Sequence, residues 1–132
     1  GFFQKRHFAV KKILVIDDEP VIRVLLRQLF EQTGYEVTEA NDGKQGIMMF
    51  KRHNPDLVIT DLIMPEEEGL ETIKKIKAID PDARIVAISG GGVGSAAIYL
   101  KLALKMGAQH VFEKPFDVKS ILTTVQAMLA AK

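Results

Sequence analysis

The sequence predicts a single α/β domain, a three-layer α/β/α sandwich built around a doubly wound parallel sheet. Five short apolar runs recur along the 132 residues, and a segment with helix start and stop signals follows each of them. Three of these runs are rich in Val and Ile and barely alternate with polar residues, which is typical of parallel strands covered on both faces. Strands that alternate with helices also favour right-handed crossovers within one sheet.

The expected strands are the apolar runs themselves. No internal repeat, low-complexity tract or linker interrupts their alternation with helices after residue 12. The runs are "KILVI" (12–16), "YEVTEA" (35–40), "DLVIT" (56–60), "ARIVAIS" (83–89) and "HVFE" (110–113).

The helix boundaries follow from capping residues, glycines and prolines. Pro20 suits the first position of a helix, Asp18 is available to cap it, and Gly34 ends it. Asp42 precedes the second helix, which ends at "HNPD" (53–56). The other helices are expected over 69–78, stopped by "DPD"; over 95–106, with Gly107 as the C-terminal glycine; and over 118–131, capped by Asp117.

Composition excludes several classes of protein. The 18 Lys and Arg balance 17 Asp and Glu, so there is no electrostatic reason to expect binding to nucleic acid or to an anionic membrane. The absence of cysteine excludes disulfides and thiolate zinc sites, and we expect a cytoplasmic protein. No apolar run approaches the roughly 18 residues of a membrane span.

The first residues differ from the rest of the chain. We interpret residues 1–11 as an N-terminal extension or cloning remnant and expect the functional domain over 12–132. The phenylalanines beside Lys5, Arg6 and His7 are also compatible with a short membrane-surface anchor.

Polar residues from distant parts of the sequence follow the expected strands. The acidic run 17–19 follows the first strand, Asp61 the third, Ser89 the fourth and Lys114 the fifth. Ligands of open α/β sheets bind beyond the carboxyl ends of the strands, so these residues are expected to meet at one edge. The sequence therefore predicts a site that combines several carboxylates with a hydroxyl and an ammonium group.

Such a cluster of carboxylates needs a cation, because otherwise some of its members would take up protons. All of its ligand atoms are hard oxygens, which favour Mg²⁺, Mn²⁺ or Ca²⁺ over zinc, and the small number of protein ligands suits Mg²⁺. A carboxylate beside Mg²⁺ can attack phosphorus and form an aspartyl phosphate. The phosphoryl oxygens then need positive charge and donors, which Lys114 and Ser89 supply.

Four motifs stand at the ends of the first, third, fourth and fifth strands: "VIDDEP" (15–20), "ITDLIMPEEEG" (59–69), "AISGGG" (87–92) and "FEKPFD" (112–117). In this order and spacing, the chain resembles the receiver domain of two-component response regulators over residues 12–131. That family includes single-domain chemotaxis and sporulation regulators. The resemblance implies a flavodoxin-like (βα)5 fold with strand order 2-1-3-4-5.

The resemblance also implies a metal site. Asp18 would bind Mg²⁺ (or Mn²⁺) directly and Asp17 through a water molecule, and Asp61 would be a further ligand. The backbone carbonyl of Ile63 would complete the protein ligands.

The implied phosphoryl chemistry centres on Asp61 as the phosphoacceptor, with Ser89 and Lys114 in contact with the phosphoryl group and a cis Lys114–Pro115 bond. The domain would catalyse its own phosphorylation and slow dephosphorylation but would transform no metabolite. One departure is Val111, which occupies a position where the family commonly has an aromatic switch residue.

Two apolar surfaces suggest partners. Val21, Ile22 and Leu25 adjoin the expected acid site and could dock a helix of a histidine kinase or histidine phosphotransfer protein. The face of 95–106, 110–113 and 118–131, with Tyr99, Val111 and Pro115, suits an output protein or a homodimer. Deep burial of the first and fourth helices is the alternative interpretation of both patterns.

The most consistent interpretation is a signalling domain that takes a phosphoryl group onto Asp61 and then changes its binding surface. A Mg²⁺-dependent phosphatase is a less consistent alternative, because its haloacid-dehalogenase form has D-x-D after the first strand. A flavodoxin-like cofactor binder would need a Ser/Thr-rich phosphate loop there. A receiver-like module that docks partners without ever being phosphorylated remains an alternative.

Overall fold

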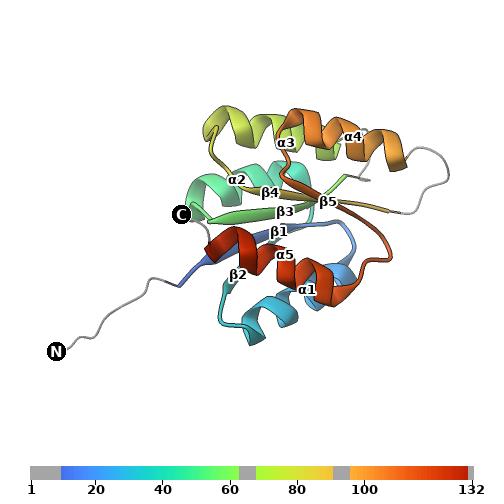
Figure 1. Ribbon diagram of the computed structural model, residues 1–132. Coiled ribbons are helices and arrows are strands. Elements are labelled where there is room, and N and C mark those ends of the chain that lie inside the picture. The colour runs from blue at the N-terminus through green and yellow to red at the C-terminus, as the bar shows by residue number, and fades with distance from the viewer. Residues whose placement is uncertain (1–9, 63–67, 91–95, 131–132) are drawn as a thin grey trace.

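Parallel strands alternate with helices throughout the part of the chain that the computed structural model describes, residues 10–62, 68–90 and 96–130 (Figure 1). The strands are β1 (Lys12–Ile16), β2 (Glu36–Ala40), β3 (Leu57–Asp61), β4 (Ile85–Ser89) and β5 (His110–Glu113). The helices are α1 (Pro20–Gln32), α2 (Gly43–His53), α3 (Glu68–Ile79), α4 (Ala96–Met106) and α5 (Val118–Ala130).

The five strands form one sheet in the order β2-β1-β3-β4-β5, and every neighbouring pair is parallel. This confirms the predicted doubly wound sheet and its strand order. Because the chain turns from β1 outward to β2 and later returns to β3 on the other side, the carboxyl ends of β1 and β3 lie side by side. A crevice opens at such a switch point.

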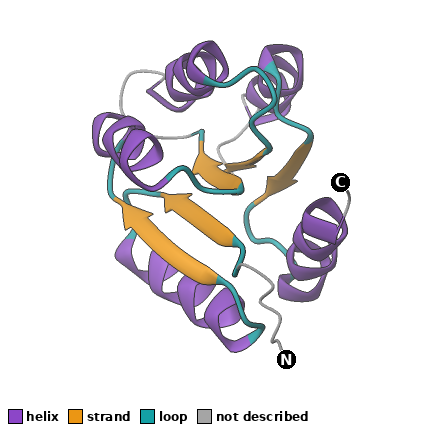
Figure 2. Cartoon of the chain, turned by 90° about the vertical axis from the view of Figure 1, so that its left-hand side faces the viewer, coloured by secondary structure: helices purple, strands orange, loops and turns teal. Residues whose placement is uncertain are grey.

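Helices cover both faces of the sheet, α1 and α5 on one side and α2, α3 and α4 on the other (Figures 1 and 2). Successive residues of β1 point into the two layers, so that Ile13 and Val15 pack with α1 and α5, and Leu14 and Ile16 pack with the other three helices. Burial on both faces explains why β1, β3 and β4 are almost continuously apolar in sequence.

Most helix ends match the capping residues in the sequence. Asp42 caps α2 by accepting a hydrogen bond from Gln45 N, and Asn54 ends that helix in the left-handed conformation with φ of 47°. Gly34 and Gly107 have φ of 97° and 117°, which glycine adopts without strain. None of the helices in the described part of the chain has the length and hydropathy that a membrane crossing needs.

The start of α1 corrects the sequence interpretation. Its N-cap residue is Glu19 rather than Asp18. The chain turns as it leaves β1, because Asp17 Oδ1 accepts a hydrogen bond from Glu19 N at 2.8 Å, and this turn places Glu19 at the helix entrance. Ile22 N and Arg23 N then donate to the Glu19 carbonyl, at 3.1 and 3.2 Å.

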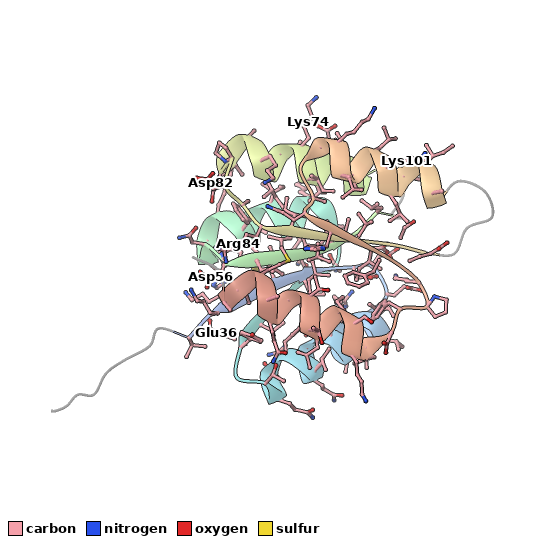
Figure 3. The ribbon with its side chains drawn as sticks, in the orientation of Figure 1. Glu36, Asp56, Lys74, Asp82, Arg84 and Lys101 are labelled. Atoms are coloured by element: carbon pink, nitrogen blue, oxygen red, sulfur yellow. The ribbon has the colours of Figure 1, made fainter. Side chains whose placement is uncertain are left out.

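The end of the sheet at which the strands begin is held by structural polar contacts. Figure 3 shows Asp56, Asp82 and Arg84 gathered there, away from the carboxyl ends of the strands. Asp56 Oδ2 accepts from Lys12 N at 2.7 Å, and Arg84 donates to the Met128 carbonyl at 2.7 Å. These contacts tie β1 to the α2–β3 loop and β4 to α5.

Glu39 of β2 is held by two arginines of α1. Its carboxylate accepts from Arg27 Nη1 at 2.8 Å and from Arg23 Nε at 3.1 Å, and its side chain is 23% exposed. The hydrogen bond from Arg27 is the main reason why the pKa of Glu39 lies below its ordinary value. Partial burial acts in the opposite direction, and the hydrogen bond from Arg23 lowers the pKa further. The cluster fastens α1 to the edge strand.

We therefore expect Glu39→Gln to lower the free energy of unfolding by about 0.5–1 kcal/mol at pH 7. A carboxyl whose pKa is depressed by folding stabilises the protein above its unfolded pKa, and this contribution is lost as the pH falls through the folded pKa. Urea unfolding of the wild-type protein and Glu39→Gln at pH 7 and pH 3 measures this contribution to the free energy of unfolding, with Glu36→Gln on the same strand as the control. A loss of stability that is equal at both pH values would contradict the ion-pair explanation.

Candidate functional site

The carboxyl ends of β1, β3 and β5 bring Asp17, Asp18, Asp61 and Lys114 to one rim of the sheet. Backbone hydrogen bonds continue past the strand ends and fix these residues. Asp17 N donates to the Ala40 carbonyl at 3.1 Å, and Lys114 N donates to the Ser89 carbonyl at 2.8 Å. The sequence prediction that these side chains would converge is confirmed in space.

Three aspartates form a compact oxygen cluster. Asp17, Asp18 and Asp61 each offer a carboxylate oxygen, and these oxygens lie within 4.8 Å of one another. Asp17 and Asp61 are only 1% and 2% exposed, whereas Asp18 faces solvent. Carboxylates this close and this buried repel one another unless positive charge compensates them.

Lys114 supplies the compensating charge. Its Nζ donates to Glu19 Oε1 at 2.8 Å, to Asp17 Oδ2 at 3.1 Å and to Asp61 Oδ2 at 3.4 Å. The lysine side chain is 13% exposed, and the Lys114–Pro115 bond is cis, as the sequence comparison with the family implied. One ammonium group thus contacts acids from two strands.

The titration of these groups reflects burial and charge. Burial raises the pKa of Asp17 above its ordinary value, although the hydrogen bond from Glu19 N and the contact with Lys114 oppose the shift. For Lys114, burial alone would lower the pKa, but the hydrogen bond to Glu19 and the charges of Asp61 and Asp17 outweigh burial and raise it. Lys114 is therefore a permanent cation, while the acid cluster still has an unfavourable excess of negative charge.

A small pocket of about 190 Å³ opens over the cluster. The described residues that line it are Asp18, Glu19, Asp61, Gly90 and Lys114. Drug-sized and cofactor-sized ligands occupy roughly 300–1,000 Å³. The pocket therefore suits an ion and a phosphoryl group better than a flavin or a nucleotide.

Ser89 lies next to the pocket but is completely buried. Its hydroxyl donates to the Gly90 carbonyl at 3.4 Å, and it is Gly90 that lines the pocket. The predicted contact of Ser89 with a phosphoryl group would require this hydroxyl to turn toward the cavity, and it stays a prediction.

Gly69, at the start of α3, lets the helix approach the site closely. A Cβ at this position would lie 2.5 Å from both the Asp61 carbonyl oxygen and Leu62 Cα. No side chain fits there without displacing the backbone that carries Asp61. The glycine of the "EEEG" segment thus has a packing role in positioning the site.

The donor set fits a small, hard divalent cation. Its oxygens come from three carboxylates, two of them buried, in a cluster that retains excess negative charge. Asp17, Asp18 and Asp61 are the residues that would hold such an ion. The predicted fourth ligand, the backbone carbonyl of Ile63, lies outside the described residues.

An apolar groove adjoins the pocket. Ile22, Leu25, Pro115 and Phe116 line it together with Lys114, and its volume is about 400 Å³. The neighbouring Val21 is 77% exposed and Leu25 is 39% exposed. The prediction that the first helix would show apolar residues beside the acids is confirmed, and Lys114 borders both the pocket and the groove.

Part of the second predicted partner surface, the face of α4, β5 and α5, belongs to the hydrophobic core. Tyr99 and Val111 are half-buried and pack against the cluster formed with α2, α3 and α4. On α4 the exposed apolar side chains are instead Ile98, Leu102 and Leu104.

Glu19 is the site residue that sequence reasoning missed. The acidic run 17–19 was expected at this rim, but Glu19 was given no role of its own, and its carboxylate makes the shortest contact of Lys114. The available signal was its position directly before Pro20, where a capping Ser, Thr, Asp or Asn is usual.

Comparisons with known proteins agree with this arrangement. The model of the response regulator receiver domain matches residues 13–126. The chemotaxis protein CheY of Bacillus subtilis is 36% identical over 119 residues, 89% of this chain and 97% of that protein. Sporulation initiation phosphotransferase F of the same organism is 33% identical over 122 residues, 92% of this chain and 96% of that protein. The crystal structure of a response regulator receiver domain protein from Clostridium thermocellum has a TM-score of 0.83 at 31% identity and covers 92% of this chain and 95% of that one.

The excess negative charge predicts stabilisation by Mg²⁺. A ligand that binds only the folded state at ten times its dissociation constant adds about 1.4 kcal/mol, which raises the melting temperature by a few degrees. We expect Asp18→Asn to lose most of this gain, because it removes the solvent-facing carboxylate of the cluster. Thermal unfolding with and without Mg²⁺ measures the effect, with Asp82→Asn at the opposite end of the sheet as the control. An undiminished Mg²⁺ effect in Asp18→Asn would exclude Asp18 as a ligand.

Proposed function

The chain belongs to the response regulator receiver domain family, whose members are phosphoacceptor switch domains of two-component signalling, and we propose that Asp61 is the residue that accepts the phosphoryl group. The observation that carries the proposal is the difference among the buried acids. Asp17 holds Glu19 N with Oδ1 and Lys114 with Oδ2, and it is not among the described residues that line the pocket. Asp61 is equally buried but borders the pocket.

Receiver domains interact with histidine kinases or histidine phosphotransfer proteins, and a phosphohistidine is the proposed donor. An Asp61 carboxylate oxygen attacks the phosphorus and forms the new P–O bond. The P–N bond of the phosphohistidine breaks, and its electron pair goes to the imidazole nitrogen. In the slow dephosphorylation, water attacks the phosphorus, the P–O bond to Asp61 breaks, inorganic phosphate leaves and the Asp61 carboxylate is restored.

Receiver domains bind Mg²⁺ at an acidic pocket, and here Asp17, Asp18 and Asp61 are the proposed ligands. Mg²⁺ supplies positive charge to the phosphoryl oxygens when it is bound. Lys114 Nζ, 3.4 Å from Asp61 Oδ2, would hold a phosphoryl oxygen on the other side. The Ser89 hydroxyl would leave the Gly90 carbonyl to donate to the same group.

The apolar groove is the proposed docking site for the donor protein. Ile22 and Leu25 of α1 and Pro115 and Phe116 offer apolar contacts that suit an amphipathic helix. Lys114 forms part of the groove wall and of the pocket wall, so a donor seated there would present its histidine next to Asp61.

The α4-β5-α5 face is the proposed output surface, either for another protein or for a second copy of the chain. Ile98, Leu102 and Leu104 give α4 an apolar exposed side. Because Val111 stands where an aromatic switch residue is common in the family, the movement of Ser89 would be transmitted differently here.

Phosphorylation of Asp61 can be tested with acetyl phosphate and Mg²⁺ by intact-mass spectrometry. We expect the wild-type protein to gain one phosphoryl group and Asp61→Ala to gain none. Asp82→Ala, which removes an exposed acid at the opposite end of the sheet, is expected to behave like wild type. Equal labelling of wild type and Asp61→Ala would show that another residue is modified, and no labelling of either would favour a docking module.

A further inference from the structure

Glu19 occupies a helix position to which its side chain is poorly suited. The N-cap of α1 usually carries Ser, Thr, Asp or Asn, whose short side chains bond the backbone N–H groups of the first turn. The Glu19 side chain makes no such bond. Its Oε1 instead accepts from Lys114 Nζ at 2.8 Å. A residue that breaks a local preference in favour of a site contact is a candidate for a functional role.

The backbone of Glu19 is fixed on both sides. Its N–H donates to Asp17 Oδ1 at 2.8 Å, and its carbonyl accepts from Ile22 N and Arg23 N. The side chain leaves this rigid base and is 59% exposed, where it lines the pocket with Asp18, Asp61 and Gly90. The carboxylate therefore stands at the mouth of the pocket through which a phosphoryl group would enter.

Glu19 also differs from Asp17 and Asp61, the other two acids that contact Lys114, because it is not part of the oxygen cluster that fits a cation. A cation bound to the cluster would reduce the hold of Asp17 and Asp61 on the ammonium. The contact with Glu19, the shortest of the three, would remain.

We propose that Glu19 is a positioning residue that holds the Lys114 ammonium at the pocket mouth and thereby slows phosphorylation of Asp61. The inference rests on the proposed function of Asp61. For an incoming phosphoryl group to bind Lys114, the ion pair between Lys114 and Glu19 has to break. The negative charge of the Glu19 carboxylate also repels the phosphoryl oxygens. The residue thus sets how readily the resting domain is phosphorylated without taking part in the bond changes.

The expected size of the effect is modest because the carboxylate is more than half exposed. Ion pairs of this kind have strengths that correspond to factors of about two to five in an equilibrium or a rate. Salt should reduce the effect, because exposed charges are screened.

The first experiment compares initial rates of phosphorylation by acetyl phosphate with Mg²⁺. We expect Glu19→Gln to be about two- to fivefold faster than wild type, with the difference shrinking in high salt. Glu113→Gln removes the same charge from the exposed residue before Lys114 and is expected to match wild type. A Glu19→Gln rate equal to or below that of Glu113→Gln would overturn the proposal.

A second variant separates the contact from the charge. Glu19→Asp keeps the carboxylate but shortens it by one methylene, and an N-cap Asp tends to bond the Ile22 N–H instead. We expect this variant to be faster than wild type as well and to have a higher melting temperature. A Glu19→Asp rate equal to that of wild type would show that charge alone acts and would overturn the claim that the contact holds Lys114.

A third measurement needs neither Mg²⁺ nor a phosphodonor. In a double-mutant cycle of Glu19→Gln and Lys114→Met, urea unfolding in a chelator should reveal a favourable coupling between the two side chains. Zero coupling would overturn the inference while leaving the role of Asp61 intact. Failure of the proposed function would be seen differently: acetyl phosphate would then add no phosphoryl group to the wild-type protein that Asp61→Ala abolishes.

Discussion

The contact of one ammonium group with three carboxylates is the constraint on which the rest of the site depends. Asp17 and Asp61 are almost fully buried, and buried charges are costly unless they are paired and hydrogen-bonded. Lys114 meets both of them and Glu19, but a single positive charge cannot neutralise these acids and Asp18 together. Burial raises the pKa of Asp17, and the remaining negative charge explains why the cluster fits a divalent cation.

The sheet order makes this contact reachable. Asp17 and Asp61 follow neighbouring strands, and Lys114 follows β5, two strands away from β3. The backbone hydrogen bond from Lys114 N to the Ser89 carbonyl fixes the start of the loop between β5 and α5. The long lysine side chain then reaches from this loop to Asp17 and Asp61. At the opposite end of the sheet, charged residues such as Asp56 and Arg84 bond the backbone and hold elements together. Charged side chains such as Asp56 and Arg84 therefore stabilise the fold at the end where the strands begin, whereas Asp17, Asp61 and Lys114 form the candidate site at the carboxyl ends of the strands.

Much of this architecture could be predicted from the sequence because it depends on short-range rules. The apolar runs, Gly34, Asn54 and Gly107 marked the strands and helix ends, and the position of each acid after a strand placed it at the rim. What could not be predicted depends on how side chains reach across space. The turn of Asp17 onto Glu19 N moved the start of α1, Glu19 contacts Lys114 from 95 residues away in sequence, and the buried Ser89 hydroxyl donates to the Gly90 carbonyl. Local propensity carries no information on such contacts.

The most direct test of this account is the Mg²⁺-induced rise in melting temperature of Lys114→Met, with Lys101→Met on the exposed side of α4 as the control. If Lys114 neutralises the acids, its loss should lower the melting temperature of the metal-free protein. The rise caused by Mg²⁺ should then be larger than in wild type, because the ion no longer competes with an ammonium group for the same carboxylates. A Mg²⁺-induced rise that is unchanged or smaller in Lys114→Met would contradict the view that this lysine balances the charge of the pocket.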